Sequence, residues 1–340
     1  MKQHGGSMAR AAMPKILLAL LCLAVMAAAG CSRAPAPVPV RLADARVIDS
    51  APVYVAQEKG IFARHGVDMK LVPVPDGVTS MSLLVAGEAD IACTGDMVAS
   101  ATALADRGAP SFTIISAMEG SVHSTALVAD ARKRIGSVQD LQGKKIGVPL
   151  GTAPHFFLEN LLLFNRVPRG SVKLVDYRMA NLPAALARGE IDAAALLDPY
   201  IVAATDQLAG NGKVFYGLDM YKLYWLVCCS TGFLKGEPDT VRRVLAALEE
   251  ACQYVNAHPA EAAAVLSRYL KVTPEAARER MKQHSFALTL TTPVMLRLEN
   301  QARWAIRRGM SDRKTMPVLP DYVNAAPLLA VKPERVTLVY

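Results

Sequence analysis

The stretch Ala185-Leu-Ala-Arg-Gly-Glu-Ile-Asp-Ala-Ala-Ala-Leu-Leu-Asp-Pro-Tyr200 decides the fold, because a near copy occurs earlier as Leu84-Val-Ala-Gly-Glu-Ala-Asp-Ile-Ala-Cys-Thr-Gly-Asp96. Both copies read Leu-x-x-Gly-Glu-x-Asp-x-Ala, and they align without a gap. Each is typical of a helix end, a glycine in the left-handed conformation, a short apolar strand, and an aspartate where the next helix begins. The repeat predicts two similar lobes.

Short apolar strands alternate with helices of about ten residues on both sides of the repeat, which predicts an α/β fold with mainly parallel sheets. After Asp239 the sequence is almost purely helical, and we expect these helices to return to the first lobe. The expected division is a discontinuous first lobe of residues 40–128 plus 225–340, and a second lobe of residues 129–224.

The N-terminus has the pattern of a bacterial export signal. Three basic residues precede an apolar run over residues 16–29, which is shorter than the roughly 18–20 residues of a membrane-spanning helix. The following Gly30-Cys31 resembles a lipobox, so we expect residues 1–30 to be a signal peptide and Cys31 to be lipidated. Residues 31–39 would form a tether to the membrane, in the periplasm or on the cell surface. An ordinary signal peptide is the alternative.

The amino-acid composition and charge make some classes of function improbable for this chain. The chain of 340 residues is 52% apolar and 20% charged, which is enough for a real core. Removal of the signal peptide lowers the formal charge from +8 to about +5, the basic residues are scattered, and aromatics make up 6%. Nucleic-acid binding is therefore not expected. No paired nucleophile and base, phosphate loop or metal-ligand spacing occurs, so we expect no enzyme activity, cofactor or metal.

A family resemblance rests on several segments together: residues 52–68, the repeated unit, residues 140–152 and Asp198-Pro-Tyr200. Their order and spacing resemble the periplasmic substrate-binding proteins of nitrate, sulfonate and taurine transporters over roughly residues 40–310. The resemblance implies a type II periplasmic-binding-protein fold, in which a ligand lies in a cleft between two lobes that close around it. It also implies an ABC permease and its ATPase as partners of a monomer. Fungal thiamine-pyrimidine synthases share this fold, but of their neighbouring cysteines only Cys228-Cys229 is present here.

Ligands of open parallel sheets bind beyond the carboxyl ends of the strands, against the N-termini of the following helices. This rule selects Asp49 and most of the positions given next. His123 is added as a candidate donor to an anion, and Trp225 as a candidate wall of the pocket. The expected ligand-binding residues are Ser50, Tyr54, Thr94, Gly95, Asp96, His123, Gly151, Thr152, Ala153, His155, Asp198, Tyr200 and Trp225.

Most of these positions have a second interpretation. Gly151 and Thr152 fit an anion site at a helix start, but Thr152 could equally cap that helix. Asp96 and Asp198 also fit N-caps, and a single histidine is more often structural. No arginine falls at a strand end in this set, which favours a small organic ligand whose acidic group is held by backbone N–H groups and hydroxyls. A zwitterionic ligand fits if Asp96 or Asp198 enters the cleft.

The sequence thus predicts an extracytoplasmic solute-binding lipoprotein that delivers its ligand to an importer. Two alternatives remain: a thiamine-pyrimidine synthase-like enzyme, and a lipid-anchored ligand sensor without transport.

Overall fold

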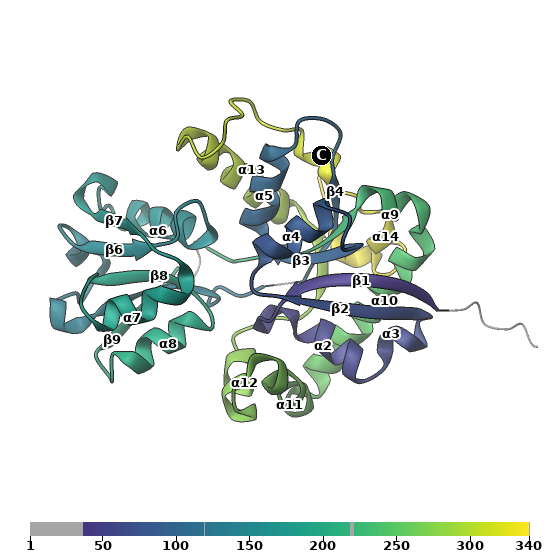
Figure 1. Ribbon diagram of the computed structural model, residues 1–340, viewed down its shortest axis with the longest axis horizontal. Coiled ribbons are helices and arrows are strands. Elements are labelled where there is room, and N and C mark those ends of the chain that lie inside the picture. Colours follow the sequence, from purple (N-terminus) through teal and green to yellow (C-terminus); the bar gives the residue numbers. More distant parts are fainter. Residues whose placement is uncertain (1–36, 119, 218–220, 340) are drawn as a thin grey trace, which may run out of the picture. The chain divides into compact units, whose positions relative to one another are not determined.

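The computed structural model describes residues 37–118, 120–217 and 221–339 (Figure 1). The expected signal peptide, Cys31 and the expected tether up to residue 36 lie outside the described residues. The last two residues of the expected tether belong to a strand: Val38 and Pro39 already pair with Val67 and Asp68, so the first strand starts at Val38 and not at Val40. Among the helices of the described part, none is long and apolar enough to cross a membrane.

The larger sheet has seven strands in the order β12-β11-β4-β10-β3-β1-β2. Neighbouring strands β1, β2 and β3 are parallel, whereas β10 is antiparallel to both β3 and β4. The central strands are buried along nearly their whole length, as in sheets covered by helices on both faces. The strands are β1 (Val38–Ala45), β2 (Val67–Val74), β3 (Ile91–Gly95), β4 (Phe112–Met118), β10 (Trp225–Ser230), β11 (Leu288–Thr291) and β12 (Val336–Thr337).

The helices of this first lobe come from both ends of the chain, as the apolar periodicity predicts. α10 packs on α2 and α11, and α13 packs on α5 (Figure 1). Residues Val241, Val244, Leu245 and Leu248 of α10 are fully buried because they recur at helical spacing on one side. The helices are α2 (Ala51–Glu58), α3 (Ile61–Arg64), α4 (Gly77–Val85), α5 (Asp96–Ala105), α9 (Thr231–Gly236), α10 (Pro238–Ala257), α11 (Pro259–Leu270), α12 (Pro274–Met281), α13 (Thr292–Arg307) and α14 (Ala326–Leu329).

The second lobe is built on a five-stranded sheet in the order β7-β6-β8-β5-β9. β6 is parallel to β7 and β8, and β5 is antiparallel to β8 and β9. Its elements are β5 (Thr125–Asp130), β6 (Lys145–Val148), α6 (Ala153–Phe164), β7 (Lys173–Asp176), α7 (Leu182–Ala187), β8 (Ala193–Leu197), α8 (Tyr200–Gln207) and β9 (Gly212–Tyr216).

Two segments connect the sheets, one between β4 and β5 and the other between β9 and β10. Membership of β5 in the second sheet corrects the expected boundary at residue 129, which assigns most of this strand to the first lobe. The apolar run over residues 125–130 fits either sheet, so the pattern could not decide between them. Between the connections, Leu223 N donates to Ser121 O at 3.3 Å, which joins the two segments.

The repeated unit has the predicted local structure in both lobes. Gly87 and Gly189 each follow a helix with φ of +75°, a conformation that a glycine adopts without strain. The two repeated aspartates make equivalent hydrogen bonds to a neighbouring strand. Asp90 Oδ2 accepts from Arg41 N at 2.8 Å, and Asp192 Oδ2 accepts from Lys145 N at 2.8 Å. Each carboxylate thereby fixes the start of its strand against the neighbouring one.

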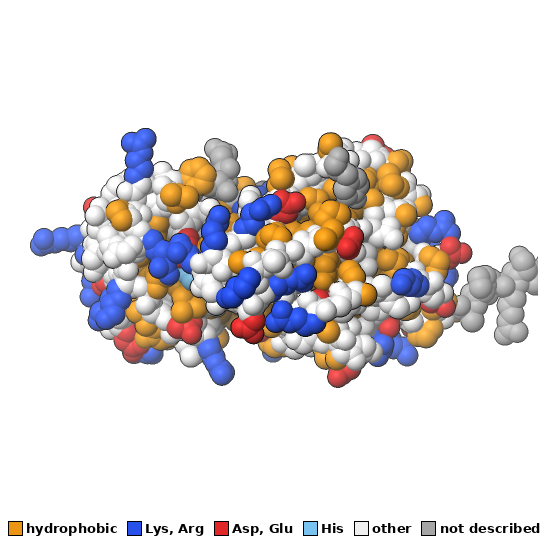
Figure 2. Space-filling view, turned by 90° about the horizontal axis from the view of Figure 1, so that it is seen from above, with side chains coloured by type: hydrophobic (Ala, Val, Ile, Leu, Met, Phe, Trp, Pro, Cys, Tyr) orange, Lys and Arg blue, Asp and Glu red, His pale blue; other side chains and the backbone are white. Residues whose placement is uncertain are grey.

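The C-terminal stretch after residue 311 lies on the first lobe. β12 pairs with β11, and Asn324 N donates to Ile114 O at 3.0 Å. Basic, acidic and apolar side chains are intermixed over the face of the molecule seen in Figure 2.

Candidate functional site

Three predicted ligand-binding residues surround a carboxylate that the sequence did not single out. Asp44, at the end of β1, is buried and accepts from Ser50 Oγ at 2.6 Å, Tyr54 Oη at 2.7 Å and Trp225 Nε1 at 3.4 Å. Burial raises the pKa of Asp44 to about 7, although the three donors act in the opposite direction. Ser50, Tyr54 and Trp225 are thus hydrogen-bond partners of Asp44, and their contact with a ligand stays a prediction.

The second predicted group, Thr94 to Asp96, is also satisfied within the first lobe. Thr94 Oγ1 donates to Gly77 O at 2.9 Å. Asp96 is buried and accepts from Met97 N at 2.7 Å and from Gln301 Nε2 at 2.9 Å, so its carboxylate joins α5 to α13. Burial raises its pKa. Gly95 lies close to the ring of Trp225, where an added Cβ would contact Cζ3 at 3.7 Å.

The start of α6 does not use Thr152 as a side-chain cap. Thr152 Oγ1 donates to Pro149 O at 2.6 Å, while Gly151 N donates to His155 Nδ1 at 3.1 Å. His155 therefore carries its proton on Nε2, which faces Glu159 Oε1 at 3.3 Å. Ala153 is buried at the first helical position.

The loop before α6 faces the first lobe across a hollow of about 550 Å³. Gly151 and Thr152 form one side of it, and apolar side chains of α4 and α5 form the other. Its first-lobe lining includes Val78, Met81, Val85, Met97, Val98 and Ala101. An apolar wall of this kind suits the hydrocarbon part of a ligand better than a small oxyanion.

Four ionisable side chains meet where strand ends of the two sheets approach each other, and we call them the interlobe cluster: Asp49, Asp198, Arg280 and His284. Asp49 follows β1 and Asp198 follows β8, so each lobe supplies one carboxylate. His284 Nε2 lies 3.6 Å from Asp49 Oδ1, and Arg280 Nη1 lies 3.8 Å from Asp198 Oδ1.

Hydrogen bonds orient the histidine of the interlobe cluster. His284 Nδ1 lies 3.0 Å from Arg280 O, a carbonyl that can only accept, so Nδ1 carries a proton. Ser124 Oγ, beside β5, lies 3.2 Å from Nε2. Burial by itself would lower the pKa of His284, but the carboxylates of Asp49 and Asp198 raise it above its ordinary value. Burial raises the pKa of Asp198, against the effect of Arg280 and His284.

The remaining predicted residues lie beside the interlobe cluster or in the second lobe. The ring of His123 meets the edge of Tyr216 at 4.7 Å between centroids, and burial with nearby His284 lowers its pKa. Burial and Asp198 raise the pKa of Tyr216. Tyr200, at the start of α8, packs against the apolar core of the second lobe.

The sequence indicated the two carboxylates of the interlobe cluster but missed Arg280 and His284. The strand-end rule selects Asp49 and Asp198, whereas Arg280 lies in α12 and His284 in the turn after it. Arg280 follows no strand, so it does not belong to the strand-end set, but its guanidinium approaches Asp198 from α12. No local signal in residues 274–284 indicates where that helix packs.

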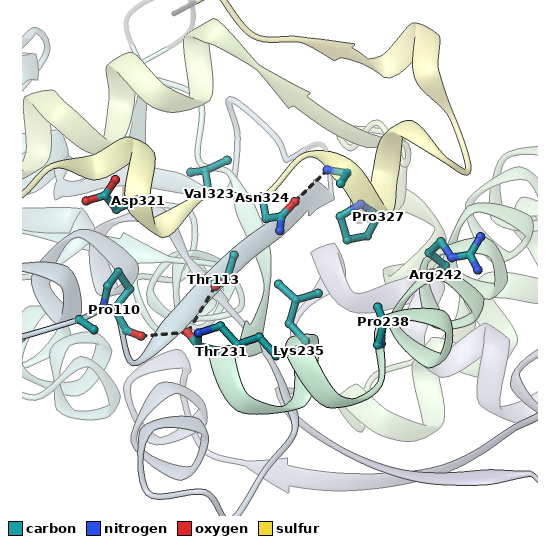
Figure 3. Close-up of a pocket in the computed structure, with 13 residues that line it drawn as sticks. Pro110, Thr113, Thr231, Lys235, Pro238, Arg242, Asp321, Val323, Asn324 and Pro327 are labelled. Carbon is teal, nitrogen blue, oxygen red and sulfur yellow. Dashed lines mark hydrogen bonds between the residues drawn. The ribbon is translucent and has the colours of Figure 1, made fainter.

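Another hollow, of about 500 Å³, lies on the first lobe between β4, α9 and the C-terminal segment (Figure 3). Thr113, Thr231, Lys235, Arg242 and Asp321 line it with apolar residues. None of the predicted ligand-binding residues lines it, and it is formed by the first lobe alone.

The described cysteines are not placed for catalysis. Cys93, Cys228, Cys229 and Cys252 are all buried and unpaired. Burial raises the pKa of Cys229 to about 12, and it raises that of Cys228 as well, which keeps both thiols protonated at neutral pH. Within residues 37–118, 120–217 and 221–339, no three His, Cys, Asp or Glu side chains lie together in a way that could hold a metal ion.

Comparison with known proteins identifies the family. Residues 47–262 match the family described as NMT1/THI5 like. The chain belongs to the NMT1/THI5-like family. A protein of Brucella abortus (strain 2308) named as a binding protein is 26% identical over 221 residues, which are 64% of this chain and 67% of the relative. The Saccharomyces cerevisiae 4-amino-5-hydroxymethyl-2-methylpyrimidine phosphate synthase THI12 is 26% identical over 228 residues, 62% of this chain and 64% of the enzyme.

Solved structures show the fold of this NMT1/THI5-like chain. The periplasmic aliphatic sulphonate binding protein SsuA of Escherichia coli has a TM-score of 0.74 at 18% identity, covering 82% of this chain and 90% of SsuA. The periplasmic nitrate-binding protein NrtA of Synechocystis PCC 6803 has a TM-score of 0.68 at 16% identity, with coverages of 88% and 89%. The predicted resemblance and the two-lobed periplasmic-binding-protein fold are confirmed.

Proposed function

We propose that this protein binds a small organic solute between its two lobes, outside the cytoplasm, and delivers it to an ABC importer. The observation that carries the proposal is the interlobe cluster. It brings charged side chains of both lobes to the facing strand ends, and buried Asp49 Oδ1, Asp198 Oδ1 and Arg280 Nη1 have no hydrogen-bond partner among the described residues. Buried polar atoms are nearly always partnered in folded proteins, so a bound solute is the natural source of the missing bonds.

Two further features support binding between the lobes. The hollow between α4, α5 and the start of α6 is lined from both lobes, so a solute there would contact both. The relative from Brucella abortus is named as a binding protein, and the structural neighbours are named for sulfonate and nitrate binding. The proposal includes export by the N-terminal signal and attachment to the membrane through a lipid on Cys31.

Ligand-dependent thermal stability tests the proposal. The purified protein is heated with sulfonates, nitrate, taurine and thiamine precursors, since a solute that binds only the folded protein raises its stability. A solute at about 100 times its Kd adds about 2.7 kcal/mol, which would raise the melting temperature by about 5–10 °C. No shift with any compound would contradict solute binding. A gene neighbourhood without a permease and an ATPase would contradict delivery and favour a sensor.

A thiamine-pyrimidine synthase-like activity is the second candidate, because the yeast enzyme is 26% identical to this chain. The burial of Cys228 and Cys229 in β10 weighs against it, since neither thiol can reach a substrate from that strand. Formation of a pyrimidine phosphate by the purified protein would support the enzyme.

A further inference from the structure

Both carboxylates of the interlobe cluster have an oxygen atom that accepts no hydrogen bond from Arg280 or His284. The Asp49 side chain is 6% exposed, and its Oδ1 accepts no hydrogen bond from the described residues although His284 Nε2 lies 3.6 Å away. Asp198 Oδ1 is in the same situation at 3.8 Å from Arg280 Nη1, and that donor is itself unpartnered. These distances exceed the range of a hydrogen bond. These atoms therefore have unused hydrogen-bonding capacity among the described residues, which a bound ligand can take up.

Because the cluster draws residues from both lobes, a ligand bound to it would touch both lobes. Asp49 belongs to the first lobe and Asp198 to the second, and Ser124 at the connection between them contacts His284. The connections pack tightly here: a Cβ on Gly120 would lie 1.8 Å from Leu223 O and 3.5 Å from Asp49 Oδ1. A group bound between the two carboxylates would thus be held at the connection of the lobes.

The charges of the cluster disfavour a simple oxyanion. Arg280 and His284 each already face a carboxylate, so nitrate or a sulfonate approaching either of them would also approach Asp198 or Asp49 and be repelled. A nitrogen group with N–H donors has the opposite effect. It can donate to both unpartnered Oδ1 atoms in charge-assisted hydrogen bonds, while an acceptor of the same molecule takes up Arg280 Nη1.

We propose that the ligand carries an ammonium or amidine-type nitrogen group that donates hydrogen bonds to Asp49 and Asp198, and an acceptor or acidic group that binds Arg280. The ligand is then a zwitterion or a polar nitrogen base, and simple anions are excluded. This inference rests on the proposed solute-binding function and specifies the class of solute.

Two pairs of compounds, matched in shape, test the role of the nitrogen group: taurine against ethanesulfonate, and 4-amidinobenzoate against benzoate. Binding to the purified protein is measured by calorimetry and thermal shift. In at least one pair the nitrogen-bearing member is expected to bind at least about tenfold more tightly than its partner. Asp49→Asn and Asp198→Asn should each reduce that ratio at least about tenfold, because each removes one charged acceptor. Asp321→Asn, an exposed carboxylate at the hollow of Figure 3, is the matched control and should leave the ratio unchanged.

The wild-type ratios test the proposal even if a variant fails to fold. Equal or tighter binding of the nitrogen-free members would overturn it, as would a ratio that persists in both folded Asn variants. Stabilisation by nitrate or sulfate with no binding of either pair would also overturn it while leaving solute binding intact. No stabilisation by any compound, including the wider panel above, would overturn both the inference and the proposed function.

Discussion

Glu159 is predicted to be the main ionic link between the two lobes. Its side chain is 7% exposed and accepts from Arg169 Nε at 2.6 Å, Trp304 Nε1 at 2.7 Å and Arg308 Nε at 2.8 Å. Glu159 belongs to α6 of the second lobe, whereas Trp304 and Arg308 belong to α13 and its end, which pack on the first. Glu159→Gln keeps the shape of the side chain and removes its charge.

The magnitude follows from the pKa of Glu159. Burial would raise it, but His155, Trp304, Arg308 and Arg169 together lower it from 4.5 to about 2. That fall corresponds to at most about 3.4 kcal/mol of stability. Arg169 and Arg308 are 47% and 37% exposed, and solvent screening reduces the value to about 2 kcal/mol.

Urea denaturation of wild type and Glu159→Gln at several pH values measures this contribution. Because the folded-state pKa lies below the unfolded one, the contribution is present above pH 4.5 and is lost as the pH falls toward about 2. The variant should be less stable by about 2 kcal/mol at pH 7, and the difference should shrink below pH 4.5. Glu299→Gln on α13, whose partner Arg303 is 54% exposed, should cost less than about 0.5 kcal/mol. A loss of stability as small as that of the control, or one independent of pH, would refute the reasoning.

Three further predictions follow from the same structure. Asp90→Ala and Asp192→Ala should each lower the free energy of unfolding by about 1–2 kcal/mol, because each removes a hydrogen-bond acceptor at the start of a strand. Glu88→Ala, at an exposed position, should change it by less than about 0.5 kcal/mol. Urea denaturation midpoints give the comparison, and equal effects at all three positions would contradict this prediction. The pKa of Asp44 is raised to about 7, so its contribution to stability is fully present below about pH 4 and is lost as the pH rises through about 7. Asp44→Asn should therefore flatten the fall of stability between about pH 4 and 7, measured by urea denaturation, and an unchanged slope in that window would contradict the titration of Asp44 there. The four described cysteines should resist iodoacetamide in the folded protein and react rapidly in urea, as measured by peptide mass spectrometry: Cys93, Cys228, Cys229 and Cys252. Modification of Cys228 or Cys229 in the folded protein would contradict their burial and support a catalytic role.

The repeated unit shows how far the sequence could predict the fold. Its helix ends, glycines and strands form within a few residues, so pattern alone was enough to place them in both lobes. The partners of the two aspartates, Arg41 and Lys145, lie on neighbouring strands far away in the sequence and could not be predicted. The sheet that β5 joins depends on pairing with β8 and β9, and its apolar run contains no information about its partners. The expected boundary at residue 129 was inaccurate for that reason.

The candidate site could also be predicted only in part. Asp49 and Asp198 follow strands, and the strand-end rule selects such positions. Ser50 and Tyr54 also satisfy the rule, but they and Trp225 turn inward to Asp44, whose burial only the assembled sheet reveals. Arg280 and His284 reach the interlobe cluster through the packing of α12, a tertiary contact with no local signature.

The central claim is that a solute binds at the interlobe cluster. Isothermal titration calorimetry tests this claim most directly. The compound that raises the melting temperature most is titrated into the wild-type protein and into Asp198→Asn. The structure predicts one molecule bound per chain, and binding at least about tenfold weaker in the variant, because one charge-assisted hydrogen bond is lost. Equal affinities in the two proteins, or no heat of binding with any stabilising compound, would contradict the claim.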